Sequence, residues 1–393
     1  MEKNNFDDIL GYNINDTDIS VAREVTKKCN GKRFRILLEI VTSCFGNCSG
    51  CSLSYAHRKD LTPSMSIEQI QKTLNYFIPI VNKKEQIRTT IVNLGTGDYF
   101  LMDKDFLLSL FKTIRIFFDQ LHTVRNVLSM STSLFLPEEK MLEKIGAMKQ
   151  YLHETQFAID GVVDPAMLEK HYYRYIKNYQ SISKHFPFFD LVVNISDAVT
   201  PNDIKKLTYF FKEMGILNFD IQYAINNTNT YRVKTNQSKF NEILDTIHDA
   251  LGDEVDNVLN LSIAIPTTKK TDEVDSIFEI MKGHAKEIAK ERVLVKPNGN
   301  IHPIGFGYGD ILLDERYDFP AIGNINSDFD EAKAEEIIFN FLKDIFIKNK
   351  KCHTCEYNLQ CYSTGYSFYN KFDNNKLDCE NVGRYIFKKL QTI

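Results

Sequence analysis

Short apolar runs rich in β-branched residues alternate with amphipathic segments through the first half of the chain. The first run, residues 35–42, is apolar and short enough for a buried strand. Similar runs follow at residues 89–94, 127–131, 156–160, 190–196 and 219–225. Because a helical pattern separates each run from the next, the sequence predicts a parallel sheet of six strands joined by right-handed crossovers.

Several of the amphipathic segments carry recognisable helix starts. Ser66 followed by Gln69 has the form of a capping box ahead of an apolar stripe that begins at Ile70. Pro137 can occupy the first turn of the helix that contains Met141. The segment 200–203 opens a helix that buries Leu207. These signals place helices between the predicted strands.

Six βα units over residues 33–225 predict an α/β fold, a partial (β/α)6 TIM-type barrel. Eight units close the usual barrel, so six would leave a wide lateral opening. In sheets of this kind ligands gather at the carboxyl ends of the strands. We therefore expect the functional residues to follow the strands.

The alternation fades after residue 225, where a polar connector leads into helical patterns at 238–251 and 272–290. Residues 293–302 predict a hairpin with Asn298 and Gly299 at its turn, and a helical pattern fills 331–348. The predicted divisions are an N-terminal extension at 1–32, the barrel at 33–225, a helical connecting region at 226–290 and a C-terminal domain at 291–393.

Composition and charge are ordinary for a globular protein. The 393 residues are 43% hydrophobic and 25% charged, and 48 Lys and Arg against 52 Asp and Glu give a net charge of −4. That balance gives nucleic-acid binding no support. No apolar run approaches the roughly 18 residues that a membrane span needs, and the N-terminus has no signal-peptide pattern. We therefore expect a cytoplasmic protein without a membrane partner.

Seven of the eight cysteines form two groups, which in a reducing compartment favours metal binding over disulfides. The first group, Cys44, Cys48 and Cys51, has CxxxCxxC spacing directly after the first predicted strand. Three thiolates are one fewer than a tetrahedral zinc or a [4Fe–4S] cube needs, so one metal position stays open for an exogenous ligand. Cys29 lies outside both groups and is interpreted as a small buried or surface thiol.

This cysteine loop resembles the defining motif of the radical S-adenosylmethionine (SAM) superfamily. The resemblance implies a [4Fe–4S] cluster on Cys44, Cys48 and Cys51 whose open iron binds the amino and carboxylate groups of SAM. It also implies reductive cleavage of SAM to a 5′-deoxyadenosyl radical, which abstracts a hydrogen atom from substrate. A one-electron donor such as flavodoxin or ferredoxin would supply the electron.

The resemblance extends to polar residues near the ends of later strands. It implies nine SAM-binding residues: Gly95, Thr96, Gly97, Asp98, Ser131, Thr132, Asp160, Arg174 and Asn194. Each has a simpler interpretation as a turn, a strand end or a solvated helix charge, and their order along the chain favours the functional one. The sequence departs from the family at Gly50, Thr96, Asp98, Tyr99 and Ala158.

The second group consists of Cys352, Cys355, Cys361 and Cys379. Its spacing alone fits a structural zinc about as well as an iron–sulfur cluster, and His353 could compete as a ligand. Together with the hairpin and the segment 321–325, it resembles the SPASM or twitch-like extension of radical SAM enzymes. Ile304 and Gly365 stand where that extension has further cysteines, so the resemblance implies one auxiliary [4Fe–4S] cluster.

The two resemblances predict a radical SAM enzyme that modifies a peptide or protein substrate. The first 30 residues are shorter than a leader-binding domain, so a leader would need another docking surface or a separate partner. Two alternatives stay open: a small-molecule or nucleic-acid-base substrate, and a non-catalytic binding protein stabilised by zinc. The sequence selects no proton donor or acceptor, although Tyr99, Tyr223 and His302 lie near strand or hairpin ends.

Overall fold

The computed structural model describes most of the predicted barrel and parts of the C-terminal region. The described residues are 32–41, 43–46, 48, 61–195, 199–214, 219–223, 246, 249, 259–261, 277–303, 320–348, 353, 355 and 358. Within them the strands form one sheet in the order β10-β9-β8-β1-β2-β3-β4-β5-β6-β7.

The central part of this sheet is parallel. Each strand pairs with the next from β1 to β7, and their bounds are β1 Lys32–Val41, β2 Ile87–Thr96, β3 Arg125–Thr132, β4 Phe157–Val163, β5 Phe189–Ile195, β6 Phe219–Tyr223 and β7 Leu259–Leu261. β8 (Arg292–Val295) pairs parallel with the other side of β1, whereas β9 (Asn300–Pro303) and β10 (Gly323–Asn324) continue the sheet antiparallel.

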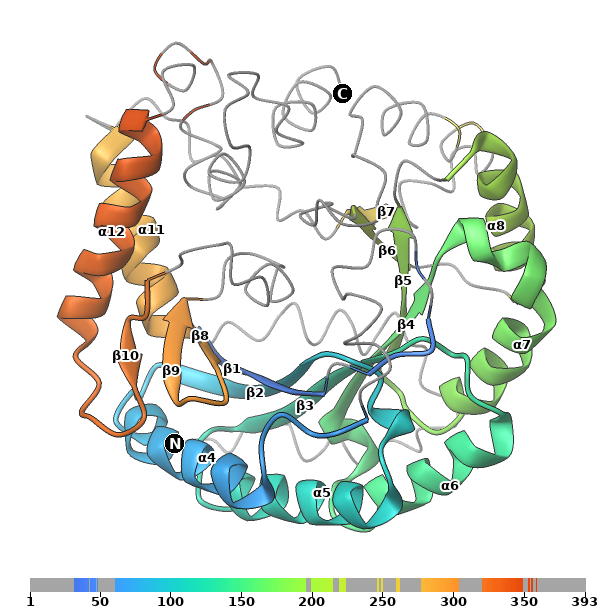
Figure 1. Ribbon diagram of the computed structural model, residues 1–393, viewed down its shortest axis with the longest axis horizontal. Coiled ribbons are helices and arrows are strands. Elements are labelled where there is room, and N and C mark those ends of the chain that lie inside the picture. The colour runs from blue at the N-terminus through green and yellow to red at the C-terminus, as the bar shows by residue number, and fades with distance from the viewer. Residues whose placement is uncertain are drawn as a thin grey trace, which may run out of the picture.

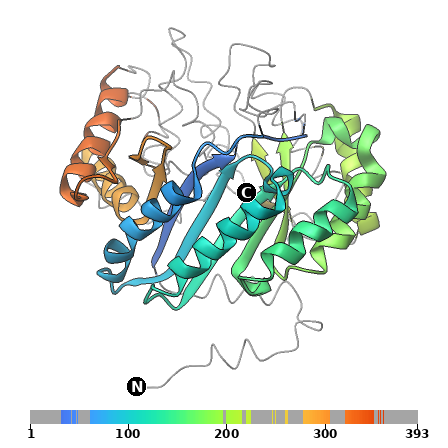
Figure 2. The same cartoon turned by 60° about the horizontal axis from the view of Figure 1, so that its bottom comes forward.

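Helices cover the convex face of the curved sheet (Figures 1 and 2). Between the parallel strands lie α4 Ile67–Asn82, α5 Lys104–Phe118, α6 Glu138–Met148, α7 Pro165–Ser183 and α8 Pro201–Met214, with the short 3₁₀ helices η2 Tyr99–Leu101 and η3 Glu154–Gln156. The helices α11 Ile277–Glu291 and α12 Glu331–Lys348 lie beside β8 at the other end of the sheet. The α/β fold of a partial parallel barrel is thus confirmed.

The predicted helix starts are confirmed, and each has a local physical cause. Ser66 caps α4 through a reciprocal pair of hydrogen bonds with Gln69, which satisfies amides that the first helical turn leaves unpaired. Pro137 is the N-cap of α6 and directly precedes its first residue. Thr200 and Asp203 bond reciprocally at the start of α8.

The hairpin at Asn298 and Gly299 is also confirmed. Gly299 has φ +82°, a conformation that side chains other than glycine rarely adopt. Its first strand, β8, joins the sheet beside β1, so the hairpin extends the barrel sheet itself. β7 lies in the predicted connecting region and adds a parallel strand beyond the predicted six.

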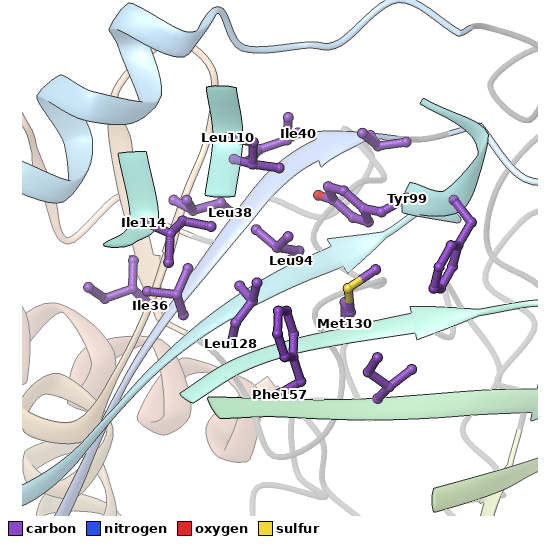
Figure 3. Close-up of a cluster of buried hydrophobic side chains, with 14 of the residues drawn as sticks. Ile36, Leu38, Ile40, Leu94, Tyr99, Leu110, Ile114, Leu128, Met130 and Phe157 are labelled. Carbon is purple, nitrogen blue, oxygen red and sulfur yellow. The ribbon is translucent and has the colours of Figure 1, made fainter. Parts of the chain in front are cut away.

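The core lies between the sheet and the helices. Figure 3 shows Ile36, Leu38 and Ile40 of β1 on the same side as Leu110 and Ile114 of α5. The aromatic ring of Phe157 on β4 continues this layer and packs edge-on against Phe111 and Phe186, at centroid distances of 6.2 and 5.2 Å. The layer fixes the register of the strands, because a slip of one residue would turn the apolar set to the other face.

The opposite face of the sheet carries charges. Arg35 of β1 is the register neighbour of Arg292 on β8, and both alternate with residues of the apolar layer. Burial lowers the pKa of Arg35 to about 10, and the positive charge of Arg292 acts in the same direction. The negative charge of Asp160 on β4 opposes this shift.

The start of α12 and the segment before it are anchored to α4 and to Lys84 just after it. Lys84 forms an ion pair of 2.7 Å with Glu331, and the Tyr76 hydroxyl donates to the carbonyl of Ser327 at 2.8 Å. Lys72 donates to the side chain of Asn326 at 2.7 Å. These contacts join the C-terminal region to the start of the barrel. In the described part of the chain, no helix combines the length and the apolar character that crossing a membrane requires.

Candidate iron–sulfur and SAM site

Two of the three predicted cluster ligands are described, and both follow β1. Cys48 is buried and Cys44 is half-buried, directly beyond the carboxyl end of the strand. The backbone amide of Gly46 donates to the sulfur of Cys44 at 3.2 Å. Such a donor stabilises a thiolate, which is the form that binds metals.

Gly46 lets the cysteine loop pass close to the end of β3. A Cβ on Gly46 would lie 3.1 Å from the Cβ of Ser133 and 3.2 Å from the sulfur of Cys44. A larger residue would therefore push the loop away from Ser133. Neither the spacing of the cysteines nor the resemblance identifies this contact.

The glycine turn after β2 packs directly against the start of the cysteine loop. A Cβ on Gly97 would lie 2.5 Å from the carbonyl oxygen of Val41 and 2.8 Å from that of Ser43, so only glycine fits there. The amide of Asp98 donates to the Ser43 carbonyl at 2.8 Å. The carboxyl ends of β1 and β2 are thereby held together at the cysteines.

The carboxylate of Asp98 joins this pair of strands to β3. One oxygen accepts from the amide of Ser133 at 2.9 Å, from its hydroxyl at 2.6 Å and from the Thr132 hydroxyl at 3.2 Å. The other accepts from the amide of Phe100 at 3.2 Å. Burial raises the pKa of Asp98, and these hydrogen bonds act in the opposite direction. The side chains of Asp98 and Thr132 are thus occupied with each other and with Ser133.

The loop that follows Ser133 has an unusual backbone and is held by α7. Leu134 has φ +56°, a conformation uncommon for a residue with a side chain. The buried side chain of Asn178 donates to the carbonyls of Leu134 and Leu136, both at 2.7 Å. Exposed Arg174 donates to the Phe135 carbonyl at 3.3 Å. Arg174 therefore lies on the helix layer and fixes the loop.

Three other predicted SAM-binding residues share the interior face of the sheet. Ser131 of β3 and Asp160 of β4 are register neighbours, and Asp190 of β5 follows Asp160. Asn194 lies farther along β5 on the same face and is buried. β4 continues to Val163, so Asp160 lies within the strand and not at its end, where the sequence resemblance placed it.

The other residues singled out in the sequence lie at the ends of strands or in the core. Gly95 and Thr96 end β2, and the side chain of Thr96 lies outside the described set. Tyr99 is fully buried in the helix-facing layer, and burial raises its pKa, so it is a packing residue. His302 is buried on β9, and Tyr223 ends β6.

Of the second cysteine group, the structure describes Cys355, and it also describes the neighbouring residue His353. Cys355 is half-buried against the core. The His353 ring packs on Phe346 of α12 at a centroid distance of 4.7 Å, with its Nε2 3.0 Å from the Phe346 carbonyl oxygen. His353 is therefore attached to the end of α12. Cys29, Cys51, Cys352, Cys361 and Cys379 lie outside the described residues, within which no three His, Cys, Asp or Glu side chains form a metal-binding group.

Sequence reasoning missed three residues that shape the site: Ser133, Tyr175 and Asn178. Ser133 carries no motif of its own, and its importance comes from the Asp98 carboxylate on another strand. Tyr175 and Asn178 lie on the buried face of α7, where their spacing resembles that of ordinary core positions. A polar Asn in the apolar stripe of a helix was the one available signal.

Solved structures share this architecture. A structure of anSMEcpe with bound AdoMet superposes with a TM-score of 0.60 and 14% identity over 92% of both chains. Streptococcus suis SuiB bound to S-adenosylmethionine gives a TM-score of 0.55 and 12% identity over 91% of this chain and 79% of that one. Both proteins are radical SAM enzymes with a SPASM domain.

The chain has the fold of the SPASM-domain radical SAM enzymes. The resemblance predicted from the cysteine spacing is thus confirmed at the level of the fold. No protein-family model matches the sequence, and no curated protein matches it. A third structure with this fold, native anSMEcpe with bound AdoMet and Cp18Cys peptide, has a TM-score of 0.57 and 13% identity over 92% and 98% of the two chains.

Proposed function

We propose that this protein is a radical SAM enzyme that modifies a peptide or protein substrate. The observation that carries the proposal is the position of Cys44 and Cys48. They follow β1 at the carboxyl edge of a barrel whose fold is shared with AdoMet-bound structures. That edge is where α/β barrels bind their ligands.

The residues at this edge fit an iron–sulfur cluster. Two sulfur donors lie on one short loop, with Cys51 three residues after Cys48 as the third, and sulfur ligands suit such clusters. The Gly46 amide donates to one of them, as amides commonly do to cluster sulfurs. When bound, the cluster would supply the electron that cleaves SAM to the 5′-deoxyadenosyl radical, which removes a hydrogen atom from substrate.

The chain's own residues would bind and orient SAM. Ser131, Asp160 and Asn194 offer hydroxyl, carboxylate and amide partners on the interior face of the sheet. Gly95, Thr96 and Gly97 would contribute backbone groups at the end of β2. Asp98, Thr132 and Arg174 would act by holding the strand ends and the 133–136 loop in place, because their hydrogen bonds join those segments.

A peptide substrate is supported by the open sheet and by the anSMEcpe structure that contains a peptide. Among the described residues, strands β1–β7 form a parallel series that ends at β7, and β8–β10 continue the sheet on the other side of β1. A barrel whose first and last strands do not pair with each other can admit an extended peptide from the side. The alternative substrate class is a small molecule or a nucleic-acid base.

The C-terminal cysteines would hold one auxiliary [4Fe–4S] cluster, with Cys352, Cys355, Cys361 and Cys379 as ligands. Four protein ligands leave no open iron, so this cluster would transfer electrons or brace the fold. We expect Cys355→Ala to lower the iron content by about one cluster while SAM still binds, because this ligand group is separate in the sequence from the cysteines that follow β1. Iron and sulfide assays with equilibrium binding of SAM check this, and loss of all iron would contradict it.

The test of the proposed function is SAM cleavage under anaerobic conditions with an artificial reductant. Reconstituted wild-type protein should form 5′-deoxyadenosine, and Cys48→Ala should form none. Cys29→Ala is the matched control, because Cys29 lies outside both groups and its replacement should leave formation of 5′-deoxyadenosine unchanged. Product formation by Cys48→Ala at the wild-type rate would refute the assignment.

A further inference from the structure

Tyr175 is a buried phenol on α7 whose hydroxyl has no evident role in the fold. Its side chain is 1% exposed. Among the residues that the structure describes, none forms a hydrogen bond with its hydroxyl oxygen. A buried hydroxyl without a partner is costly, by about 1–3 kcal/mol, so native proteins usually provide one.

The candidate cluster ligands lie within electrostatic reach of this hydroxyl. Burial raises the pKa of Tyr175, and negative charge on Cys48, Asp164 and Cys44 raises it further, in that order. The phenol therefore keeps its proton and can donate it in a hydrogen bond. Asp164 already accepts from the Ala166 amide as the N-cap of α7.

The ring of Tyr175 is held in a fixed position. It packs edge-on against Phe135, with the centroids 5.4 Å apart and the planes at 82°. Phe135 belongs to the loop that Asn178 and Arg174 bind to the same helix. The residue before this loop, Ser133, is the one that the Gly46 backbone approaches. Helix α7, the 133–136 loop and the cysteine loop thus pack in sequence, and a Cβ on Gly46 would lie 3.6 Å from the sulfur of Cys48.

We propose that Tyr175 is a positioning residue that donates a hydrogen bond to the sulfur of Cys48 in the cluster-loaded protein. This inference rests on the proposed function and adds a residue that sets the cluster's reduction potential. An O–H dipole directed at a ligand sulfur stabilises the reduced cluster more than the oxidised one, because reduction adds negative charge. Tyr175 would thereby favour the reduced state that SAM cleavage requires.

The test is an anaerobic redox titration of reconstituted Tyr175→Phe, followed by EPR. This substitution keeps the ring against Phe135 and removes only the hydroxyl. At a fixed applied potential, the ratio of reduced to oxidised SAM-site cluster should fall about tenfold, which for one electron is about 59 mV toward lower potential. Resonance Raman spectra should show iron–sulfur stretching bands that shift in D₂O for the wild type and shift less for the variant.

Tyr172→Phe is the matched control. Tyr172 lies on the same helix, but its hydroxyl bonds to Glu213 of α8. Its removal should leave the potential and the D₂O shift unchanged. An unchanged potential in Tyr175→Phe, with a full cluster, would overturn this inference and leave the proposed function intact. A wild-type protein that binds no iron would instead overturn the proposed function.

Discussion

The two faces of β1 differ in what they contribute. On the side of the helices, Phe34, Ile36, Leu38 and Ile40 are each at most 1% exposed and belong to one continuous core. On the interior side, the strand carries Arg35 and Glu39 on either side of buried Leu37, and no apolar core requires the two charged residues. The comparison indicates that the helix-facing side stabilises the fold, whereas the interior side and the carboxyl ends are available for chemistry.

Beyond the end of β1, too, polar groups are separate from the apolar core. Gly97, Asp98 and Ser133 bind the ends of β1, β2 and β3 to one another, and Gly46, between Cys44 and Cys48, lies close to Ser133. This polar layer is part of neither the apolar core nor the solvent-exposed surface. Its hydrogen bonds give the cysteine loop a defined position that packing alone would not specify.

The largest effect on stability is expected on the helix-facing side. Phe157→Ala should lower the free energy of unfolding by about 3–5 kcal/mol, because the fully buried ring packs on Phe111 and Phe186. Urea unfolding measures this change through its midpoint. Ser131→Ala, on the interior face of the neighbouring strand, is the control and should change the free energy by less than about 0.5 kcal/mol. Equal losses in both variants would remove the distinction between the faces.

A smaller effect is expected in the polar layer. Asp98→Asn should cost about 1–3 kcal/mol, because amide and hydroxyl donors face both carboxylate oxygens and either orientation of an amide sets donor against donor. Asp103→Asn is the control. Asp103 also caps a helix, through the Phe106 amide, and Asn is an equally good N-cap, so its urea midpoint should not move. A midpoint for Asp98→Asn equal to that of the wild type would contradict the role given to this carboxylate.

The pH dependence of stability tests a buried group of the helix layer. Burial lowers the pKa of His284 on α11 to about 3, and the charge of Arg292 adds to the shift. Above pH about 6.5 the ring is neutral in both states and contributes no pH dependence. As the pH falls toward about 3, only the unfolded chain takes up the proton, so stability should fall by about 1.4 kcal/mol per pH unit.

The substitution that isolates this effect is His284→Leu. It removes the titrating ring, so the variant should lose less stability than the wild type between pH 6.5 and pH 5.5, by about 1 kcal/mol. Urea unfolding at the two pH values measures the difference. His122→Gln is the control, because the His122 side chain is exposed in the folded protein, and its pH dependence should match the wild type. Parallel losses in wild type and His284→Leu would show that His284 is not responsible.

The sequence predicts the parts of the fold that depend on local pattern. Six strands, the Ser66 cap and the Gly299 turn each follow from residues close together in the chain. The placement of β8 beside β1 joins residues about 250 positions apart, and no local pattern encodes that pairing. Asp160 illustrates the same limit: Asp-Gly is typical of a turn, yet Gly161 lies within β4 and packs against Phe189.

In the candidate site, too, the sequence predicts the residues with a local motif and not those whose role depends on distant contacts. Cys44 and Cys48 are predictable because their spacing is itself the signal. Tyr175 is one of 19 tyrosines, and only the packing of α7 against the 133–136 loop distinguishes it from the others. Asp98 is predictable as a residue of the glycine turn, but its bonds to Thr132 and Ser133 depend on the adjacent strand.

The most direct test of the central claim is EPR spectroscopy of the anaerobically reconstituted and reduced protein, with and without SAM. The cluster on Cys44, Cys48 and Cys51 has an open iron in this account, so added SAM should change its spectrum, and Cys48→Ala should lack the signal that changes. A protein that holds only zinc at these cysteines, or no metal, would contradict the account.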